Sequence, residues 1–204
     1  MAAAPSRAAA RPDVNGSEGT RERILDVALR LFAEHSFAGT SLQMIADEMG
    51  ITKAAVYHHF HTREELLGTL VRPALDELRV VIAAAAAQRT AHARAEHMLT
   101  GFVDLAIRHR KLTAILGADQ AIARFLKTQE HFEEIVERPL ALLGGPAPGP
   151  AGRVNATIAL AGIASAAGGE LLDDLDDGAM RRYLAETGRR ILGLRTPRTH
   201  RPGG

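Results

Sequence analysis

The sequence of 204 residues predicts an all-α protein, with short helices at its N-terminal end and a larger helical body after them. Two observations lead to this prediction. Apolar residues recur at i, i+3, i+4 and i+7 along most of the chain, which is the spacing of one face of an α-helix. At Thr40 and Thr62, a threonine followed three residues later by Gln or Glu marks a helix start, because these side chains can cap the first turn.

The first of two adjacent short helices is expected over residues 40–49. Thr40 and Gln43 form the predicted capping box, in which the hydroxyl accepts one free N–H and the amide reaches back. The apolar stripe that follows consists of Leu42, Ile45, Ala46 and Met49. Gly50 suits the left-handed position that ends such a helix, so the chain is expected to turn there.

The second short helix is expected to run from Thr52, a natural N-cap, to Phe60. Its inward-facing residues are Ala55, Val56 and Phe60, and its outward-facing residues are Lys53, Ala54, Tyr57 and His58. Two short helices joined by a glycine turn form a helix-turn-helix, in which the second helix enters the major groove of DNA. Another helix is expected to begin at the Thr62 capping box.

The outward face of this second helix carries groups suited to DNA contact. Small side chains at Ala54 and Ala55 let the helix approach base edges, and Tyr57 and His58 can donate to phosphate oxygens. Lys53 supplies the only full positive charge on the helix. The alternative is an ordinary helical hairpin without a DNA function. The capped start, the small residues and the Tyr-His-His-Phe ending together favour the DNA-reading interpretation.

Residues 20–67 resemble the N-terminal domain of the TetR family of bacterial transcriptional regulators. The family's apolar pattern in the opening helix is matched by Ile24, Leu25, Ala28, Leu31 and Phe32. Its G-x-x-x-T-S/T turn corresponds to Phe37 to Ser41, and its Y-x-H/Y-F ending to Tyr57, His59 and Phe60. The chain has Arg63 where relatives have lysine, and Ala54 where they often have glycine or proline. Arginine keeps the charge and can fork onto a phosphate.

The resemblance implies a homodimer that places two recognition helices about 34 Å apart, in successive major grooves of a pseudo-palindromic double-stranded DNA operator. The candidate DNA contacts are Thr40, Ser41, Gln43, Thr52, Lys53, Ala54, Ala55, Tyr57, His58, His59 and Arg63. Residues 1–63 hold seven lysines and arginines and seven aspartates and glutamates, so their formal charge is zero. Binding is therefore expected to depend on individually placed donors rather than on bulk positive charge.

The body, residues 64–194, follows the DNA-binding domain of residues 20–63 and is expected to bind a ligand and form the dimer. Apolar stripes predict helices over residues 64–87, 91–109, 111–117, 119–143, 153–172 and 178–194. Pro73 is expected to kink the first of these helices, either as a lever between head and body or as a bend that only fits the packing. The Pro/Gly-rich stretch 144–152 is predicted to be a non-helical linker.

The last two helices are the expected dimer surface. TetR relatives pair their last two long helices into a four-helix bundle, which implies an interface through residues 153–194. Glycine is unfavourable inside a helix, so Gly162, Gly168 and Gly169 suggest close helix packing; a codon bias toward glycine and alanine is the competing explanation. The acidic residues Asp173, Asp174, Asp176 and Asp177 lack the spacing of a calcium loop and are interpreted as helix N-terminal charge compensation.

The resemblance also implies a small-molecule pocket between the helices of residues 91–172, whose occupation releases the DNA. The candidate lining residues are His97, Met98, Phe102, Asp104, Leu116, Phe125, Gln129, Phe132, Ile158 and Ser165. Their mostly apolar character indicates a hydrophobic or aromatic effector. The alternatives are that the apolar residues are ordinary core, and that the protein is an architectural DNA-binding protein without a ligand.

No catalytic or metal-binding motif stands out in the sequence. It contains no G-x-S-x-G, no glycine-rich phosphate loop and no H-E-x-x-H. His92 and His97 are five residues apart and so do not share one helix face. A non-enzymatic protein without a cofactor or a metal is therefore expected.

The chain ends, residues 1–19 and 195–204, are expected to be disordered tails. Arg7 and Arg11 could contact the DNA minor groove, or the first tail could simply be solvated. The chain contains no cysteine, which is typical of a reducing cytoplasm, and its longest apolar stretch, residues 80–87, is too short to span a bilayer. A cytoplasmic protein that does not contact the membrane is the resulting prediction.

Overall fold

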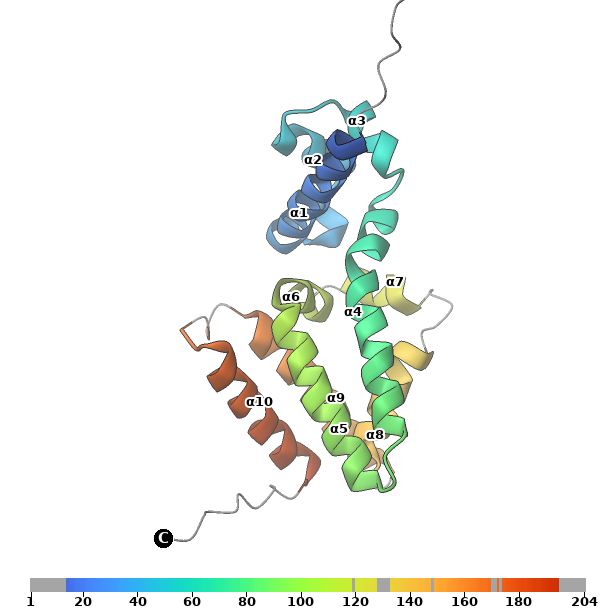
Figure 1. The fold of residues 1–204 in the computed structure, drawn as a ribbon, viewed down its shortest axis with the longest axis vertical. Coiled ribbons are helices and arrows are strands. Elements are labelled where there is room, and N and C mark those ends of the chain that lie inside the picture. The colour runs from blue at the N-terminus through green and yellow to red at the C-terminus, as the bar shows by residue number, and fades with distance from the viewer. Residues whose placement is uncertain are drawn as a thin grey trace, which may run out of the picture.

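The computed structural model describes residues 14–118, 120–127, 133–147, 149–169, 172 and 174–194. Within these ranges the chain is helical apart from turns and short connections, which confirms the predicted all-α fold. The head consists of α1 (Val14–Gly39), α2 (Leu42–Met49) and α3 (Lys53–His59). In Figure 1, α4 (Arg63–Ala86) runs from this head into the body formed by the later helices.

The first helix begins earlier than predicted, at Val14, inside the segment 1–19 that the sequence predicts to be a disordered tail. Between Pro12 and Ile24 the sequence contains no proline, so the helical hydrogen bonds can extend backward from the buried turn around Ile24. The remainder of that tail, with Arg7 and Arg11, lies outside the described residues, as does the tail 195–204.

A single residue, Ser36, interrupts α1 with φ 65° and ψ 163°. The break separates the long helical run from a short turn that contains Phe37. The Gly39 N–H donates to Ser36 Oγ at 3.2 Å and stabilises this turn. Phe37 is thereby brought back onto Phe32, and the two ring centroids lie 5.2 Å apart in an edge-to-face arrangement.

Helix α4 agrees closely with the predicted range 64–87 and contains Pro73 within one helix. Proline cannot donate a helical hydrogen bond, so one carbonyl of the preceding turn loses its partner. Pro73 is exposed, and water can therefore satisfy that carbonyl. The role of Pro73 as a lever concerns motion and stays a prediction.

The helices α5 (Ala91–Arg108) and α6 (Arg110–Ala118) occupy their predicted ranges. The single helix predicted over residues 119–143 is wrong. The described residues form α7 (Gln120–Lys127), a π-helical turn η1 (Glu133–Glu137) and α8 (Arg138–Gly144). Pro139 accounts for part of this difference, because it has no N–H to continue an uninterrupted α-helical ladder and instead sits in the first turn of α8.

The last two helices are α9 (Pro150–Gly168) and α10 (Asp177–Leu192). The predicted linker 144–152 is too long, since α8 includes its first residue and α9 begins at Pro150. Proline suits the first turn of a helix, where its missing N–H has no partner to lose. Gly152 belongs to α9 and packs against backbone carbonyls of the connection, where a Cβ atom has no room.

The acidic stretch before α10 forms a helix start, as the sequence predicts. Asp176 is the N-cap and accepts from the Ala179 N–H at 2.8 Å. Asp177 lies in the first turn and pairs with Arg110 of α6. Asp173 lies outside the described residues.

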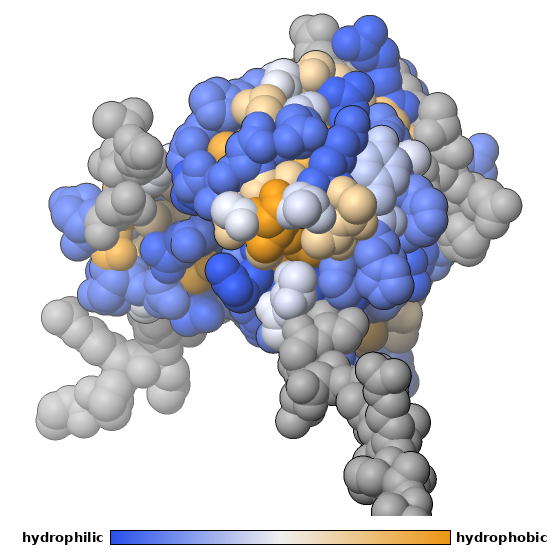
Figure 2. Space-filling view, turned by 90° about the horizontal axis from the view of Figure 1, so that it is seen from above, coloured by the Kyte–Doolittle hydropathy of each residue, from blue (hydrophilic) through white to orange (hydrophobic). Residues whose placement is uncertain are grey.

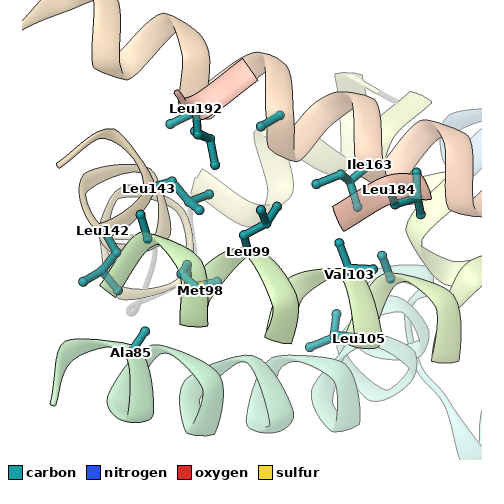
Figure 3. Packing of buried hydrophobic residues seen from close by; sticks show 14 of the residues in the cluster. Ala85, Met98, Leu99, Val103, Leu105, Leu142, Leu143, Ile163, Leu184 and Leu192 are labelled. Atoms are coloured by element: carbon teal, nitrogen blue, oxygen red, sulfur yellow. The ribbon is translucent and has the colours of Figure 1, made fainter. Parts of the chain in front are cut away.

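Two hydrophobic clusters hold the molecule together. The body cluster is built around α5, and Figure 3 shows Met98 facing Ala85 of α4 on one side, with Leu99 and Val103 directed toward Ile163 and Leu184 on the other. The head cluster combines buried side chains of α1, α2 and α3 with residues of three later helices. These later residues are Leu66, Leu67, Val71 and Ala74 of α4, Leu112 and Ile115 of α6, and Ile122 of α7. A domain boundary at residue 63 therefore cuts through the head cluster.

None of the helices in the described ranges is long and apolar enough to cross a membrane. Within the same residues, no three His, Cys, Asp or Glu side chains gather in a way that could hold a metal ion.

Candidate DNA-binding surface

The start of α2 differs from the predicted capping box. Ser41 is the N-cap, and its Oγ accepts from the Met44 N–H at 3.2 Å. Thr40 is only 1% exposed, and its hydroxyl donates to the carbonyl oxygens of Leu31 at 3.0 Å and Ser36 at 2.9 Å. Gln43 does not reach back to the cap and donates to Asp47 at 2.7 Å. Thr40 thus fastens α1 to α2, and the exposed hydroxyl at this helix start belongs to Ser41.

The turn between α2 and α3 agrees with the prediction. Gly50 adopts φ 65° and ψ 31°, and its N–H donates to the carbonyls of Ala46 and Asp47. The Ile51 N–H also donates to the Ala46 carbonyl, at 3.0 Å. This left-handed corner, which glycine adopts without strain, fixes the angle at which α3 leaves α2.

Helix α3 presents the predicted residues to solvent. The Thr52 hydroxyl caps it by accepting from the Ala55 N–H at 3.2 Å. Val56 and Phe60 are fully buried in the head cluster and anchor the inner face. The predicted contacts that are exposed are Ser41, Gln43, Thr52, Lys53, Ala54, Tyr57 and His58, while Ala55, His59 and Arg63 are half-buried.

The Lys53 ammonium lies 5.4 Å from the centre of the Tyr57 ring, so the two side chains of this surface contact each other. The His58 and His59 rings also meet, with centroids 5.3 Å apart. Burial lowers the pKa of His59, and the charges of His58 and Arg21 lower it further. The neutral form of His59 is therefore favoured in the free protein.

Arg63 contacts the head itself rather than projecting freely. Its Nη1 donates to the carbonyl oxygens of Phe37 at 3.2 Å and Ala38 at 2.8 Å, and its guanidinium lies 5.0 Å from the Phe37 ring centre. These bonds hold the turn before α2, and a phosphate contact by Arg63 would compete with them. The adjacent Thr62 caps α4 as predicted, accepting from the Glu65 N–H at 3.0 Å.

Arg21 is a further candidate contact that sequence reasoning missed. It is exposed on α1, and its guanidinium lies 4.9 Å from the ring centre of Phe60 at the end of α3. No local pattern indicates this placement, because it depends on how α1 crosses α3. Figure 2 looks down on this end of the molecule and shows a largely hydrophilic surface around a small apolar area.

The predicted ligand-lining residues do not share one cavity. Met98 is buried and Phe102 half-buried in the body cluster, whereas Leu116 and Phe125 pack against the head cluster. Asp104 is paired with Arg181. His97, Ile158 and Ser165 are exposed, and Gln129 and Phe132 lie outside the described residues.

A groove of about 560 Å³ lies elsewhere in the body, between α4, η1 and α8. Its lining consists of Arg79, Ile82, Ala83, Ala86, Glu133, Glu134, Glu137, Arg138 and Ala141. A second hollow of about 270 Å³ shares Ala86, Arg138 and Ala141 with it and reaches Arg94 of α5. The lining of the larger groove combines apolar side chains with charged side chains of both signs.

The sequence matches known regulators mainly in the head. Residues 24–70 match the family described as bacterial regulatory proteins, tetR family. The HTH-type transcriptional repressor KstR2 of Rhodococcus jostii (strain RHA1) is 39% identical over 66 residues, which are 32% of this chain and 32% of that protein. The HTH-type transcriptional regulator AcrR of Shigella flexneri is 41% identical over 61 residues, which are 30% of this chain and 28% of that protein. The chain thus matches about a third or less of the length of these relatives.

The fold likeness extends over most of the chain. SCO3833, a member of the TetR transcriptional regulator family from Streptomyces coelicolor A3, has a TM-score of 0.65 at 25% identity, covering 85% of this chain and 91% of that one. AibR in complex with isovaleryl coenzyme A and operator DNA has a TM-score of 0.57 at 20% identity, covering 82% and 96%. Residues 24–70 therefore match the N-terminal domain of the TetR family, and the chain shares the fold of a solved member of that family.

Proposed function

We propose that this protein is a cytoplasmic transcriptional regulator, most simply a repressor, that binds a pseudo-palindromic operator as a homodimer and is released by a small molecule. The observation that carries the proposal is the arrangement of α3. Its inner face is anchored by Val56 and Phe60, its start is capped by Thr52, and its outer face offers Lys53 and Tyr57. An exposed helix held this firmly suits insertion into a major groove.

The electrostatics of the head favour positional contacts over bulk attraction. Arg30 is already engaged by Glu34 and Glu48 through side-chain hydrogen bonds. Lys53 and Arg21 therefore stand out as cations beside α3, together with the hydroxyls of Ser41 and Thr52 at two helix starts. Backbone N–H groups and hydroxyls at helix N-termini are suitable phosphate donors.

The dimer is proposed to form through residues 153–194. Val154 and Ile158 of α9 are 55% and 52% exposed, and Tyr183 of α10 is 49% exposed. Large apolar side chains with this exposure on neighbouring helices are typical of a surface that a second subunit covers. The proposal is also supported by the resemblance to TetR relatives, which pair their last two long helices into a four-helix bundle.

The effector is proposed to bind in the groove between α4, η1 and α8, rather than among the residues predicted from sequence. The apolar lining residues Ile82, Ala86 and Ala141, together with Arg138, support a ligand with an apolar part and a charged end. The complex of AibR with isovaleryl coenzyme A is a solved example of such a molecule bound within this fold. An architectural DNA-binding protein without a ligand stays the alternative.

Operator selection tests the DNA-binding part of this proposal. Purified protein should enrich a pseudo-palindrome from a random duplex library, and Lys53→Ala should weaken binding to it by about tenfold if the ammonium reaches a phosphate or a base. Tyr57→Phe should weaken binding to all sequences alike, because a phosphate contact carries no sequence information. The matched control is Lys111→Ala, which removes an exposed lysine on α6. No enrichment, or equal binding by all four proteins, would contradict the proposal.

A thermal-shift screen tests the effector. A compound that raises the unfolding temperature and lowers operator affinity supports the sensor, because binding to one state shifts the equilibrium toward it. Arg138→Ala should reduce the thermal shift of an anionic hit, whereas Arg153→Ala, an exposed arginine on α9, should not. A hit unaffected by Arg138→Ala would exclude this groove, and operator binding insensitive to every stabilising compound favours the architectural alternative.

A further inference from the structure

Helix α6 lies between the head and α9. On the head side, its residues Leu112 and Ile115 are buried in the head cluster with side chains of α1. On the other side it packs along α9, and Figure 1 shows it beneath α1. A change in the distance between α6 and α9 is passed to the head, because close-packed interiors transmit strain.

Gly168, the last residue of α9, lies directly against the backbone of α6. A Cβ atom at this position would lie 2.5 Å from Ala114 Cβ, 2.7 Å from the Arg110 carbonyl oxygen and 2.8 Å from Ala114 Cα. Favourable carbon–carbon contacts are longer, at about 3.5–4.0 Å. Two of the obstructing atoms belong to the backbone of α6, so no side-chain rotation can make room.

Gly162 of the same helix has no such constraint. A Cβ atom there would meet nothing within 4 Å inside the protomer. Contacts within the chain therefore explain the glycine at 168 and not the glycine at 162. Gly68 of α4 is also open around a Cβ atom and lies outside the proposed dimer interface, so alanine there serves as the control that leaves the spacing of α6 and α9 unchanged.

We propose that Gly168 is a positioning residue that sets the distance between α9 and the head, and through it the separation of the two recognition helices in the dimer. This inference rests on the proposed function, because it requires α9 to belong to the dimer interface. The N-terminal end of α6 is also held by the ion pair of Arg110 with Asp177 at the start of α10. If α9 is fixed in the dimer, the position of α6 determines where each head lies. It thereby determines which distance between operator half-sites the dimer fits.

The size of the effect follows from the contact distances. A Cβ atom at 168 would lie 2.5 Å from Ala114 Cβ, whereas two carbon atoms in contact are about 3.5 Å apart. Alanine at 168 would therefore push α6 and α9 apart by about 1 Å. A shift of about 1 Å in each protomer changes the separation of the recognition helices by about 2 Å, against a rise of about 3.4 Å per base pair. This is more than half a base-pair step, so the preference between adjacent spacings should change.

The test compares wild type, Gly168→Ala and Gly68→Ala on three selected operators that differ by one base pair in half-site spacing. Fluorescence anisotropy gives, for each protein, the ratio of affinities for its best and next-best spacing. For Gly168→Ala we expect this ratio to change by about threefold or more, and the affinity for the best wild-type operator to fall about tenfold. Gly68→Ala, which adds a Cβ in open space on α4 and outside residues 153–194, should keep the wild-type ratio.

Equal loss of affinity on all three operators, or no change on any, overturns the inference, because Gly168 then does not position the head. If Gly168→Ala does not fold, Ala114→Gly loosens the same contact without added bulk and must change the same ratio. Since the chain has no cysteine, a spin label on Glu22→Cys of α1 also reports the head-to-head distance directly, and Gly168→Ala must change it. Failure of the wild type to bind any selected operator is a separate outcome, which overturns the proposed function as well.

Discussion

Replacing Ser36 with glycine is expected to stabilise the protein, because the backbone there has a conformation that suits glycine. With φ 65° and ψ 163°, Ser36 lies in a region occupied almost only by glycine, where another residue costs about 1–3 kcal/mol. The substitution also loses the hydrogen bond from the Gly39 N–H to Ser36 Oγ, worth about 1 kcal/mol. The greater freedom of glycine in the unfolded chain costs about 0.5–1 kcal/mol more. If about 3 kcal/mol of strain is released and these two losses are subtracted, the net stabilisation is about 1 kcal/mol.

Thermal unfolding of the full chain measures this effect. A gain of about 1 kcal/mol raises Tm by about 2–4 °C for a protein of this size. The matched control is Ser165→Gly, which places glycine in the regular helix α9 and should lower Tm. Operator affinity should stay unchanged in Ser36→Gly, because the Thr40 hydroxyl bonds to the carbonyl of residue 36, which glycine retains. A Tm below that of the wild type would show that the strain at Ser36 is smaller than the roughly 1.5–2 kcal/mol that the substitution loses, and would refute the expected stabilisation.

Three further predictions concern single contacts. Thr52→Ala removes the cap of α3, so it should lower the free energy of unfolding in urea by about 1 kcal/mol and weaken operator binding. The control Thr52→Ser should keep the wild-type stability and affinity. Wild-type operator binding by Thr52→Ala would show that the cap does not position α3. Arg189→Ala should cost about 2 kcal/mol, between the values for exposed and buried pairs, because the 16% exposed side chain donates to Glu96 from both Nε and Nη2. Its control Arg190→Ala, at a side chain that is 78% exposed, should cost less than about 0.5 kcal/mol, and equal urea midpoints for the two variants would contradict the difference. Finally, the pKa of His59 is lowered by burial, so the unfolded chain binds its proton more readily and stability should fall as pH drops below about 6.5. His59→Gln should flatten this decline in the urea midpoint, and an unchanged slope would assign it to other groups.

The parts of the head that could be predicted from sequence are those whose partners lie within a few residues. Thr52 and Thr62 each cap a helix by accepting an N–H three residues later, and Gly50 closes α2 with the preceding turn. Thr40 could not be predicted in this way. Its hydroxyl bonds to carbonyls of α1 that are placed by the positive φ of Ser36, and this frees Ser41 to become the cap.

The body was predictable as helices but not as a binding site. A buried methionine such as Met98 and a pocket-lining methionine have the same sequence pattern, because both lie on the apolar face of an amphipathic helix. The groove depends instead on where α4 meets η1 and α8. It joins Ile82 with Arg138, and the π-helical turn that shapes one wall has no signature in the apolar periodicity.

The head cluster implies that the DNA-binding region does not fold independently, although the sequence pattern suggests a separate domain. A fragment of residues 14–75 would lack Leu112 and Ile115 of α6 and Ile122 of α7, whose side chains are buried in the head cluster. Burying three such side chains contributes roughly 5–9 kcal/mol, which is comparable with the whole stability of a small domain. The isolated fragment should therefore show a poorly dispersed amide spectrum and no cooperative urea transition, in contrast to the full chain. A cooperative transition would mean that α6 and α7 only rest on the head, and the position of α6 could not then determine where the recognition helices lie.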